Sequence, residues 1–379
     1  MLQRRIAVIA PPWYPIPPQG YGGIELVVGL LVKELRSRGH DVTLFGSAGS
    51  GLAVRPLAPE GWDRALGGPD ERWREVTYAA RLATALRRER PFDVIHDHTG
   101  GAGLVVAASA GRGPVVHTVH GPLGEPARTF YAALRGVGLI AISDHQRTTG
   151  PGLPWLATVP NAVDLGALLE PGAVAREPYL LCLARISPEK GQHVAIAVAR
   201  RTGRPLVLAG KIEQTAASLA YYGTEIAPHL DGVRVRHLTN VAGREKAELL
   251  AGATALLAPV QWPEPFGLAV AEAMASGTPA VALRQGALPE LVEDGVSGFV
   301  CDTVDEMVAA VGAAAELDAA ACARAARLRF SPRALVERCL SVYAAQAAGA
   351  PEAAALVRAP VQPAGSAWAL ATGAPPAPN

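Results

Sequence analysis

Short runs of β-branched and other apolar residues alternate along the chain with longer segments in which Ala, Leu and Arg recur at helical spacing. Such runs are typical of strands buried on both faces, and the alternation is typical of parallel β-α units covered by helices. In the first half we expect helices such as 25–38 and 72–90. The strands expected between them are 6–10, 41–45, 92–96, 115–119, 139–142 and 158–159.

A second series of strands follows the Gly- and Pro-containing stretch 170–178. We expect these strands at 179–183, 205–209, 233–237, 255–259, 279–283 and 298–301. The fold class predicted is therefore α/β, with two doubly wound Rossmann-like domains, 1–170 and 176–330, facing a central cleft. Residues 331–347 are expected to form a helix that returns to the first domain. The Ala- and Pro-rich tail 350–379 is expected to be disordered.

Composition narrows the classes of function. The 379 residues are half hydrophobic, which suits two large cores and argues against a small binding module. A net charge of +1 gives no reason to expect nucleic acid or an anionic membrane as the main partner. The four cysteines have no C-x-x-C spacing and are expected to be reduced and buried. With no signal-peptide pattern and no run of about 20 apolar residues, we expect a soluble cytoplasmic protein.

Two segments suit the binding of an anion. Gly22 and Gly23 follow the first strand and precede a helix, where backbone N–H groups can approach a phosphate; a glycine pair also occurs in ordinary turns. Arg185 and Lys190 follow the first strand of the second domain and could clamp a diphosphate. Only four of the 35 basic residues are lysine, which favours a specific role for Lys190 over a solvated loop.

Two glutamates near residue 270 are the strongest candidates for chemistry. Pro265 holds Glu264 extended ahead of a helix, and Glu272 lies within that otherwise apolar helix. Carboxylates accept hydrogen bonds from paired sugar hydroxyls, so one could hold a hexose and the other a ribose. The alternative is a loop charge and an exposed helix face.

Histidines gather at strand ends in the first domain. His120 ends a strand and could bind a sugar hydroxyl or serve a structural role, while His117 lies deeper on the same face. The sequence His96-Asp97-His98 resembles a metal cluster, but adjacent strand residues point to opposite faces. We therefore predict no metal site.

Taken together, these motifs resemble the retaining GT-B glycosyltransferases, specifically glycosyltransferase family 4. The resemblance covers roughly residues 4–345 and depends on several motifs occurring in order. They are Gly22-Gly23-Ile24-Glu25, His120-Gly121-Pro122, Pro160-Asn161-Ala162-Val163-Asp164, Arg185 with Lys190-Gly191, and Glu264-Pro265-Phe266-Gly267 followed by Glu272.

The resemblance implies a role for each motif. Arg185 and Lys190 would hold the diphosphate of a nucleotide sugar, Glu272 its ribose and Glu264 the donor sugar, with backbone contacts from Phe266, Gly267 and Leu268. Gly22 and Gly23 would meet the phosphate, His120 would meet the sugar near its C6 hydroxyl, and Lys211 would approach the nucleotide. A metal-independent front-face transfer of a hexose, with retention, follows from the family, with a UDP-hexose as the expected donor. The segments 14–21 and 123–131 would read a small-molecule or glycolipid-like acceptor.

Several points stay open in the sequence. Thr239 and Asn240 replace the Gly and apolar pair that the family usually places near the base, so the nucleotide is not fixed. The alternative functions are a non-catalytic nucleotide-sugar-binding protein and a nucleotide-sugar epimerase. The arginines of 72–90 are interpreted as a solvated basic face, with peripheral membrane association as the alternative. The acceptor, the hexose and the oligomeric state are not indicated.

Overall fold

The computed structural model describes residues 3–18 and 20–348, with the backbone alone at positions 64–65. The chain forms two compact units. The first unit combines the chain up to Asp164 with the segment that starts at Phe330, and the second unit covers Leu165–Arg329. The predicted tail 350–379 lies outside the described residues.

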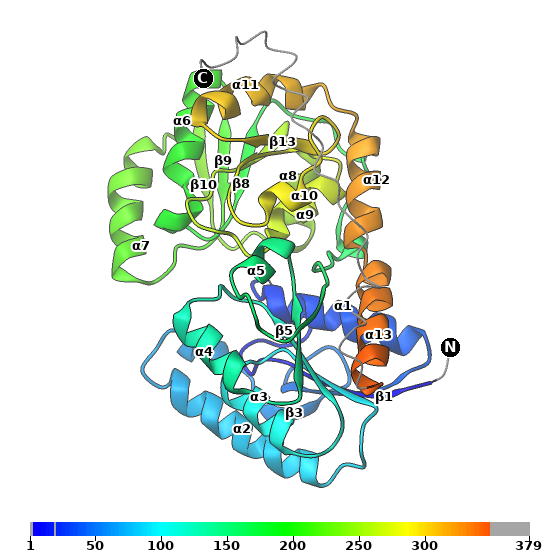
Figure 1. The fold of residues 1–379 in the computed structure, drawn as a ribbon. Coiled ribbons are helices and arrows are strands. Elements are labelled where there is room, and N and C mark those ends of the chain that lie inside the picture. Colours follow the sequence, from blue (N-terminus) through cyan, green and yellow to red (C-terminus); the bar gives the residue numbers. More distant parts are fainter. Residues whose placement is uncertain (1–2, 19, 349–379) are drawn as a thin grey trace, which may run out of the picture. The chain divides into compact units, whose positions relative to one another are not determined.

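A parallel sheet of seven strands forms the centre of the first unit, in the order β3-β2-β1-β4-β5-β6-β7. Figure 1 labels β1, β3 and β5 of this unit. The strands are β1 Arg5–Ile9, β2 Asp41–Ser47, β3 Arg55–Ala58, β4 Val94–Asp97, β5 Val115–Val119, β6 Val137–Ala141 and β7 Trp155–Thr158. Buried strands of this kind need an apolar layer on each face, and the helices supply both layers.

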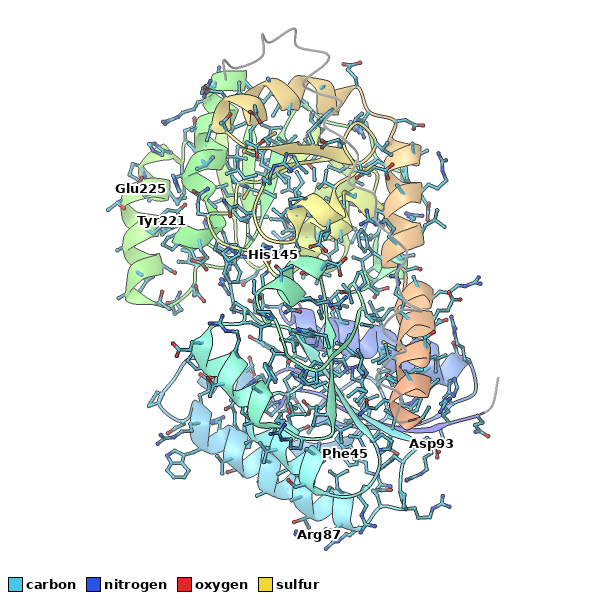
Figure 2. All side chains as sticks on the ribbon, in the orientation of Figure 1. Phe45, Arg87, Asp93, His145, Tyr221 and Glu225 are labelled. Atoms are coloured by element: carbon cyan, nitrogen blue, oxygen red, sulfur yellow. The ribbon has the colours of Figure 1, made fainter. Side chains whose placement is uncertain are left out.

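Helices cover both faces of this sheet. They are α1 Gly23–Ser37, α2 Glu71–Arg87, α3 Gly101–Ser109, α4 Glu125–Ala133, α5 Asp144–Thr148 and α13 Pro332–Ala347. Leu31 of α1 and Tyr343 of α13 belong to the core on one face, and Leu82 of α2 and Leu104 of α3 belong to the core on the other. Figure 2 shows Phe45 within this unit and Arg87 at its surface.

The second unit repeats the plan with a parallel sheet of six strands, in the order β10-β9-β8-β11-β12-β13. Its strands are β8 Leu180–Leu183, β9 Leu206–Ala209, β10 Val235–Leu238, β11 Ala255–Ala258, β12 Ala280–Leu283 and β13 Gly298–Cys301. Its helices are α6 Gln192–Thr202, α7 Ala216–Tyr221, α8 Gly243–Gly252, α9 Leu268–Ala275, α10 Leu288–Leu291, α11 Val304–Ala315 and α12 Ala319–Phe330. Ile196 of α6 and Val311 of α11 fill the core on one face.

Two features of the first sheet differ from the expectation. Strand β3 was not predicted, because its sequence Arg-Pro-Leu-Ala is short and contains Pro56; a proline is tolerated there because β3 is an edge strand. Strand β7 begins three residues earlier than expected, at Trp155. Its partly exposed residues give a weak apolar signal, and its pairing continues through the Val159 N–H, which donates to the Ala141 carbonyl.

The four cysteines are buried, as their surroundings in the sequence predict. Cys182, Cys301, Cys322 and Cys339 are buried and form no disulfide with one another. Burial raises the pKa of the Cys182 thiol to about 12, so it stays protonated.

No helix in residues 3–18 or 20–348 is long and apolar enough to cross a membrane.

Candidate active site

The order of strands in the second unit defines where a ligand is expected. The chain runs from β8 outwards to β9 and β10 and then returns to β11 on the other side of β8. The loops that follow β8 and β11 therefore leave the carboxyl edge of neighbouring strands in different directions. In doubly wound sheets ligands bind at such a switch point. Lys190 lies in the first of these loops and Glu264 in the second.

Close packing holds the two loops together. Gly191 has a left-handed φ of 70°, and a Cβ at this position would overlap the Pro259 carbonyl oxygen. Beside it, the Gln261 N–H donates to the Glu189 carbonyl over 2.8 Å. Only glycine permits both the conformation and the approach. The Gly after Lys190 thus brings the lysine next to the loop that carries Glu264.

Lys190, Glu264 and Trp262 form one cluster at this junction. Lys190 Nζ lies 2.5 Å from Glu264 Oε2, and each side chain is 14% exposed. The indole N–H of Trp262 donates to the same oxygen over 3.0 Å, and the ammonium lies 5.0 Å from the centre of the indole ring. A cation over an aromatic face and a charge-assisted hydrogen bond both restrain Lys190. Trp262 thus orients both charged groups.

The backbone of Glu264 is held from a third side. A Cβ at Gly286, where φ is 57°, would overlap the backbone of Glu264, and the Ala287 N–H donates to the Glu264 carbonyl over 2.8 Å. Phe266 is buried, and Gly267 has a φ of 98° immediately before α9 begins at Leu268. The Glu-Pro-Phe-Gly segment therefore ends in a helix N-terminus, where backbone N–H groups and the helix dipole favour an anion.

Arg185 lies in the same loop as Lys190 and is surrounded by acids. Its guanidinium is 2.6 Å from Glu189 Oε1 and 3.5 Å from Glu213 Oε2. Burial raises the pKa of Glu189, but hydrogen bonds from Arg185 and Ser187 outweigh it and lower the pKa below the usual value. The Lys211 carbonyl accepts from the Ile186 N–H over 2.8 Å, which ties the β9 loop to this one.

Glu272 is buried on α9 rather than exposed. Its side chain is 6% exposed, and Lys246 Nζ of α8 lies 2.7 Å from both carboxylate oxygens. An unpaired carboxylate at this depth would be costly, so Lys246 stabilises its charged form. This position excludes the exposed helix face as the explanation of Glu272.

In the loop after β10, Asn240 belongs to the pair of residues that replaces the family's usual Gly and apolar residue. Its φ is 56°, and it is the one non-glycine residue of the described chain with a left-handed backbone. Glycine prefers this conformation, and asparagine tolerates it better than most residues. A glycine could therefore adopt the backbone conformation of Asn240 without strain.

In the first unit the switch point lies between β1 and β4. Gly22 precedes α1 with a φ of 138°, and Gly23 is its first residue. A Cβ at Gly22 would lie 2.9 Å from Pro18 Cβ and 3.2 Å from Glu25 Oε2. Glu25 itself is 3% exposed, and its burial raises its pKa to about 7 despite hydrogen bonds from the backbone N–H groups of Glu25 and Tyr14. A carboxyl group is thus already present at this helix N-terminus.

His120 belongs to a buried group of histidines. Its Nε2 lies 2.9 Å from His98 Nδ1, and the two rings are stacked. Burial, aided by the nearby His117, lowers the pKa of His120 to about 3, and burial also lowers the pKa of His98 well below its usual value. Both imidazoles are neutral at physiological pH, so His120 can donate or accept a hydrogen bond but carries no charge.

The His96-Asp97-His98 segment divides between two faces, as expected for a strand. His96 contacts Tyr343 and Thr118, each over 2.7 Å, whereas the Asp97 carboxylate contacts His117 over 2.8 Å. Among the described residues, no group of three or more His, Cys, Asp or Glu side chains is arranged to hold a metal ion.

The predicted site residues thus fall into two sets. Arg185, Lys190, Glu264, Phe266, Gly267, Leu268 and Glu272 belong to the second unit, where Lys190 and Glu264 are in direct contact, and Gly22, Gly23 and His120 belong to the first. Two partners were missed in the sequence, Trp262 and Lys246. Trp262 could have been found from its position two residues before Glu264, and Lys246 from the scarcity of lysine in the chain.

Family comparisons cover both units separately. The family described as Glycosyl transferases group 1 matches residues 170–328. The family described as Glycosyltransferase Family 4 matches residues 21–166.

Individual relatives match over most of their length. The D-inositol 3-phosphate glycosyltransferase of Xylanimonas cellulosilytica is 29% identical, over 90% of this chain and 96% of the relative. The phosphatidyl-myo-inositol mannosyltransferase of Mycolicibacterium smegmatis is 27% identical, over 81% of this chain and 83% of the relative.

Solved structures show the same fold. A glycosyltransferase involved in avilamycin A biosynthesis is 29% identical and superposes with a TM-score of 0.70, over 92% of this chain and 99% of the other. The Anabaena protein HepE, in complex with UDP and glucose, is 22% identical and has a TM-score of 0.70, over 90% of this chain and all of the other. The fold is therefore GT-B.

The buried carboxyl group at the start of α1 predicts a pH-dependent stability. Because folding raises the pKa of Glu25 from 4.5 to about 7, the folded state favours the protonated form, and this contribution is lost as the pH rises through 7. Glu25→Gln keeps an acceptor for the backbone but cannot ionise. Between pH 5 and pH 8 the variant should gain about 2 kcal/mol relative to the unmodified protein, measured by urea unfolding. Glu34→Gln on the same helix is the control, and an equal, constant difference for both variants would contradict the prediction.

Proposed function

The chain belongs to glycosyltransferase family 4, and from this premise we propose that it moves a hexose from UDP-hexose to an acceptor hydroxyl with retention of anomeric configuration. The observation that carries this proposal is the cluster of Lys190, Glu264 and Trp262 at the switch point of the second sheet. A cation and a sugar-binding carboxylate held within hydrogen-bond distance suit the junction of a phosphate and a hexose.

The donor would extend across the carboxyl edge of the second sheet. Glu272, held by Lys246, would accept the ribose hydroxyls, and Glu264 would accept hydroxyls of the hexose. Arg185 and Lys190 would bind the diphosphate, with the α9 N-terminus and the backbone of Phe266, Gly267 and Leu268 beside it. For the first unit we retain the roles that the resemblance implies, a phosphate contact for Gly22 and Gly23 and a sugar contact for His120.

The reaction exchanges one bond at the anomeric carbon for another. The bond from this carbon to the diphosphate oxygen breaks, and the acceptor oxygen forms the new bond on the same face. The acceptor's proton passes to the departing diphosphate, which becomes its base. Arg185 and Lys190 would stabilise the charge that develops on that diphosphate, the largest contribution a site of this kind makes. We propose that these two cations replace a metal ion in this role.

The names of the relatives suggest the class of acceptor. One is a mannosyltransferase of phosphatidyl-myo-inositol and another glycosylates D-inositol 3-phosphate. We propose an acceptor of the same chemical kind, a polyol or glycolipid-like molecule that offers a ring hydroxyl. UDP is the nucleotide bound by a structural neighbour, and it is the first donor nucleotide to test.

A donor panel tests the proposal directly. The purified chain is mixed with UDP-, GDP- and ADP-hexoses without an acceptor, and nucleotide release and thermal stability are followed. We expect a UDP-hexose to raise the Tm and to be hydrolysed slowly, since water can replace a missing acceptor. Stabilisation without any hydrolysis would instead indicate a non-catalytic nucleotide-sugar-binding protein. No stabilisation by any donor would contradict the proposed function.

Substitutions in the second unit separate chemistry from binding. Lys190→Ala and Glu264→Ala should each lower kcat by on the order of two to three powers of ten, the scale of a lost transition-state contact. Glu272→Ala should mainly raise the Kd of the donor. Lys33→Ala, at an exposed position of α1, is the control for loss of a lysine. Full activity in Lys190→Ala would rule out the mechanism.

Trp262→Phe isolates the orienting hydrogen bond. The variant keeps an aromatic ring near Lys190 but removes the indole N–H that donates to Glu264. The loss of one hydrogen bond to a charged group should lower kcat/KM about tenfold. Trp155→Phe is the matched control, because its indole N–H donates to the Gly150 carbonyl in the first unit. Equal activity of both variants would show that the Trp262 hydrogen bond has no role.

A further inference from the structure

A chain of three side chains runs from the interior of the first unit to a partly exposed tyrosine. Asp97 at the end of β4 contacts His117 of β5, and His117 contacts Tyr131 of α4. Asp97 is fully buried and His117 is 2% exposed, whereas Tyr131 is partly exposed. Tyr131 is the last residue of the segment 123–131, which the resemblance assigns to the acceptor side, whereas neither Asp97 nor His117 has a role in the function proposed above.

Several hydrogen bonds hold the Asp97 carboxylate in place at the buried end of these three side chains. Its Oδ2 accepts from the backbone N–H groups of Thr99 and Gly100, over 3.1 and 3.0 Å, and its Oδ1 accepts from the Thr99 hydroxyl over 2.7 Å. The contact from His117 Nδ1 measures 2.8 Å. An acceptor with this many donors is rigid, and it requires a proton on His117 Nδ1.

The tautomer of His117 then determines how Tyr131 can act. In the neutral tautomer with its proton on Nδ1, the form for which a spectrum is predicted below, Nε2 is only an acceptor. Tyr131, whose oxygen lies 3.1 Å from Nε2, must donate its O–H to it. The phenol proton then lies in the hydrogen bond to His117, and the Tyr131 oxygen offers only lone pairs to a ligand.

The space beside this oxygen is open on one side because residue 100 is glycine. A Cβ at Gly100 would lie 3.7 Å from the Tyr131 oxygen and 3.8 Å from His117 Cε1. Gly100 has a φ of 65°, which glycine adopts without cost. The absent side chain leaves room for a ligand atom next to the hydroxyl.

Taken together, we propose that the Tyr131 oxygen is a binding site for a hydroxyl group of the acceptor, with Asp97 and His117 as positioning residues. This inference rests on the proposed function for the identity of the ligand as an acceptor. The ligand class is a polyol or sugar, since its hydroxyl must donate to the phenol oxygen. Burial, followed by the charge of Asp97, raises the pKa of Tyr131 to about 12, so the phenol binds the acceptor and does not deprotonate it.

Tyr222 of the second unit provides a matched comparison. Its hydroxyl lies 3.4 Å from His237 Nδ1, while His237 Nε2 lies 2.8 Å from the Gly210 carbonyl. The same logic applies, because the carbonyl requires a proton on Nε2 and leaves Nδ1 as an acceptor. Tyr222 therefore has the same chemistry but lies in the unit assigned to the donor.

The experiment titrates the full chain, labelled with 13C at tyrosine Cζ, with myo-inositol. Tyr131→Phe and Tyr222→Phe assign the two resonances. We expect myo-inositol to shift the Tyr131 resonance saturably and to leave Tyr222 unchanged. The hexa-O-methyl ether of myo-inositol, which cannot donate a hydrogen bond, should shift neither. In Tyr131→Phe, binding of myo-inositol should weaken about fivefold to tenfold.

The same samples separate the possible results. An unmoved Tyr131 resonance, an equal shift with the methyl ether, or unchanged binding in Tyr131→Phe overturns the inference. A long-range 1H–15N spectrum should show His117 protonated at Nδ1 and bare at Nε2, and the opposite tautomer also overturns it. UDP-glucose is titrated separately. Its failure to bind would contradict the proposed function, while a specific shift of Tyr131 by myo-inositol would still establish the polyol site.

Discussion

The candidate site depends on the contact between the loops that follow β8 and β11. Gly191 lies against the Pro259 carbonyl, and a side chain at this position would force the loops apart. Lys190 is the neighbour of this glycine and Glu264 lies in the opposite loop, so their 2.5 Å contact follows from the packing of the backbone. Trp262 then holds the carboxylate of Glu264, and the Gly286 turn holds its backbone. The geometry of the charged groups is thus set by glycines.

Each of the three cations described at this edge of the sheet is paired with at least one carboxylate. Lys190 pairs with Glu264, Lys246 with Glu272, and Arg185 with Glu189 and Glu213. Each cation is therefore held in place by its ion pair. A diphosphate at Lys190 would share the ammonium with Glu264, so phosphate and sugar contacts are coupled through one pair of side chains.

Much of this arrangement could be predicted from the sequence. Apolar runs located almost every strand, because strands of parallel sheets are buried on both faces. The edge strand β3 escaped notice since its pattern is short and interrupted by Pro56. Motif spacing located Lys190, Glu264 and Glu272, but not Lys246, because a partner on another element becomes adjacent only after folding. Trp262 was missed although it is close to Glu264 in the sequence, because the direction of its indole N–H is set by the fold. The left-handed backbone of Asn240 could not be predicted either, because glycine, the usual marker of this conformation, is absent at this position.

The position of α13 affects the order in which the chain can fold during synthesis. Tyr343 of α13 is fully buried in the core of the first unit and contacts His96 of β4. The ribosome therefore delivers this helix only after the whole second unit, Leu165–Arg329, has been made. The second unit is continuous in the chain and can fold as soon as it emerges. The first unit, although synthesised first, keeps part of one apolar face uncovered until α13 has been made, and this face is open to aggregation in the meantime.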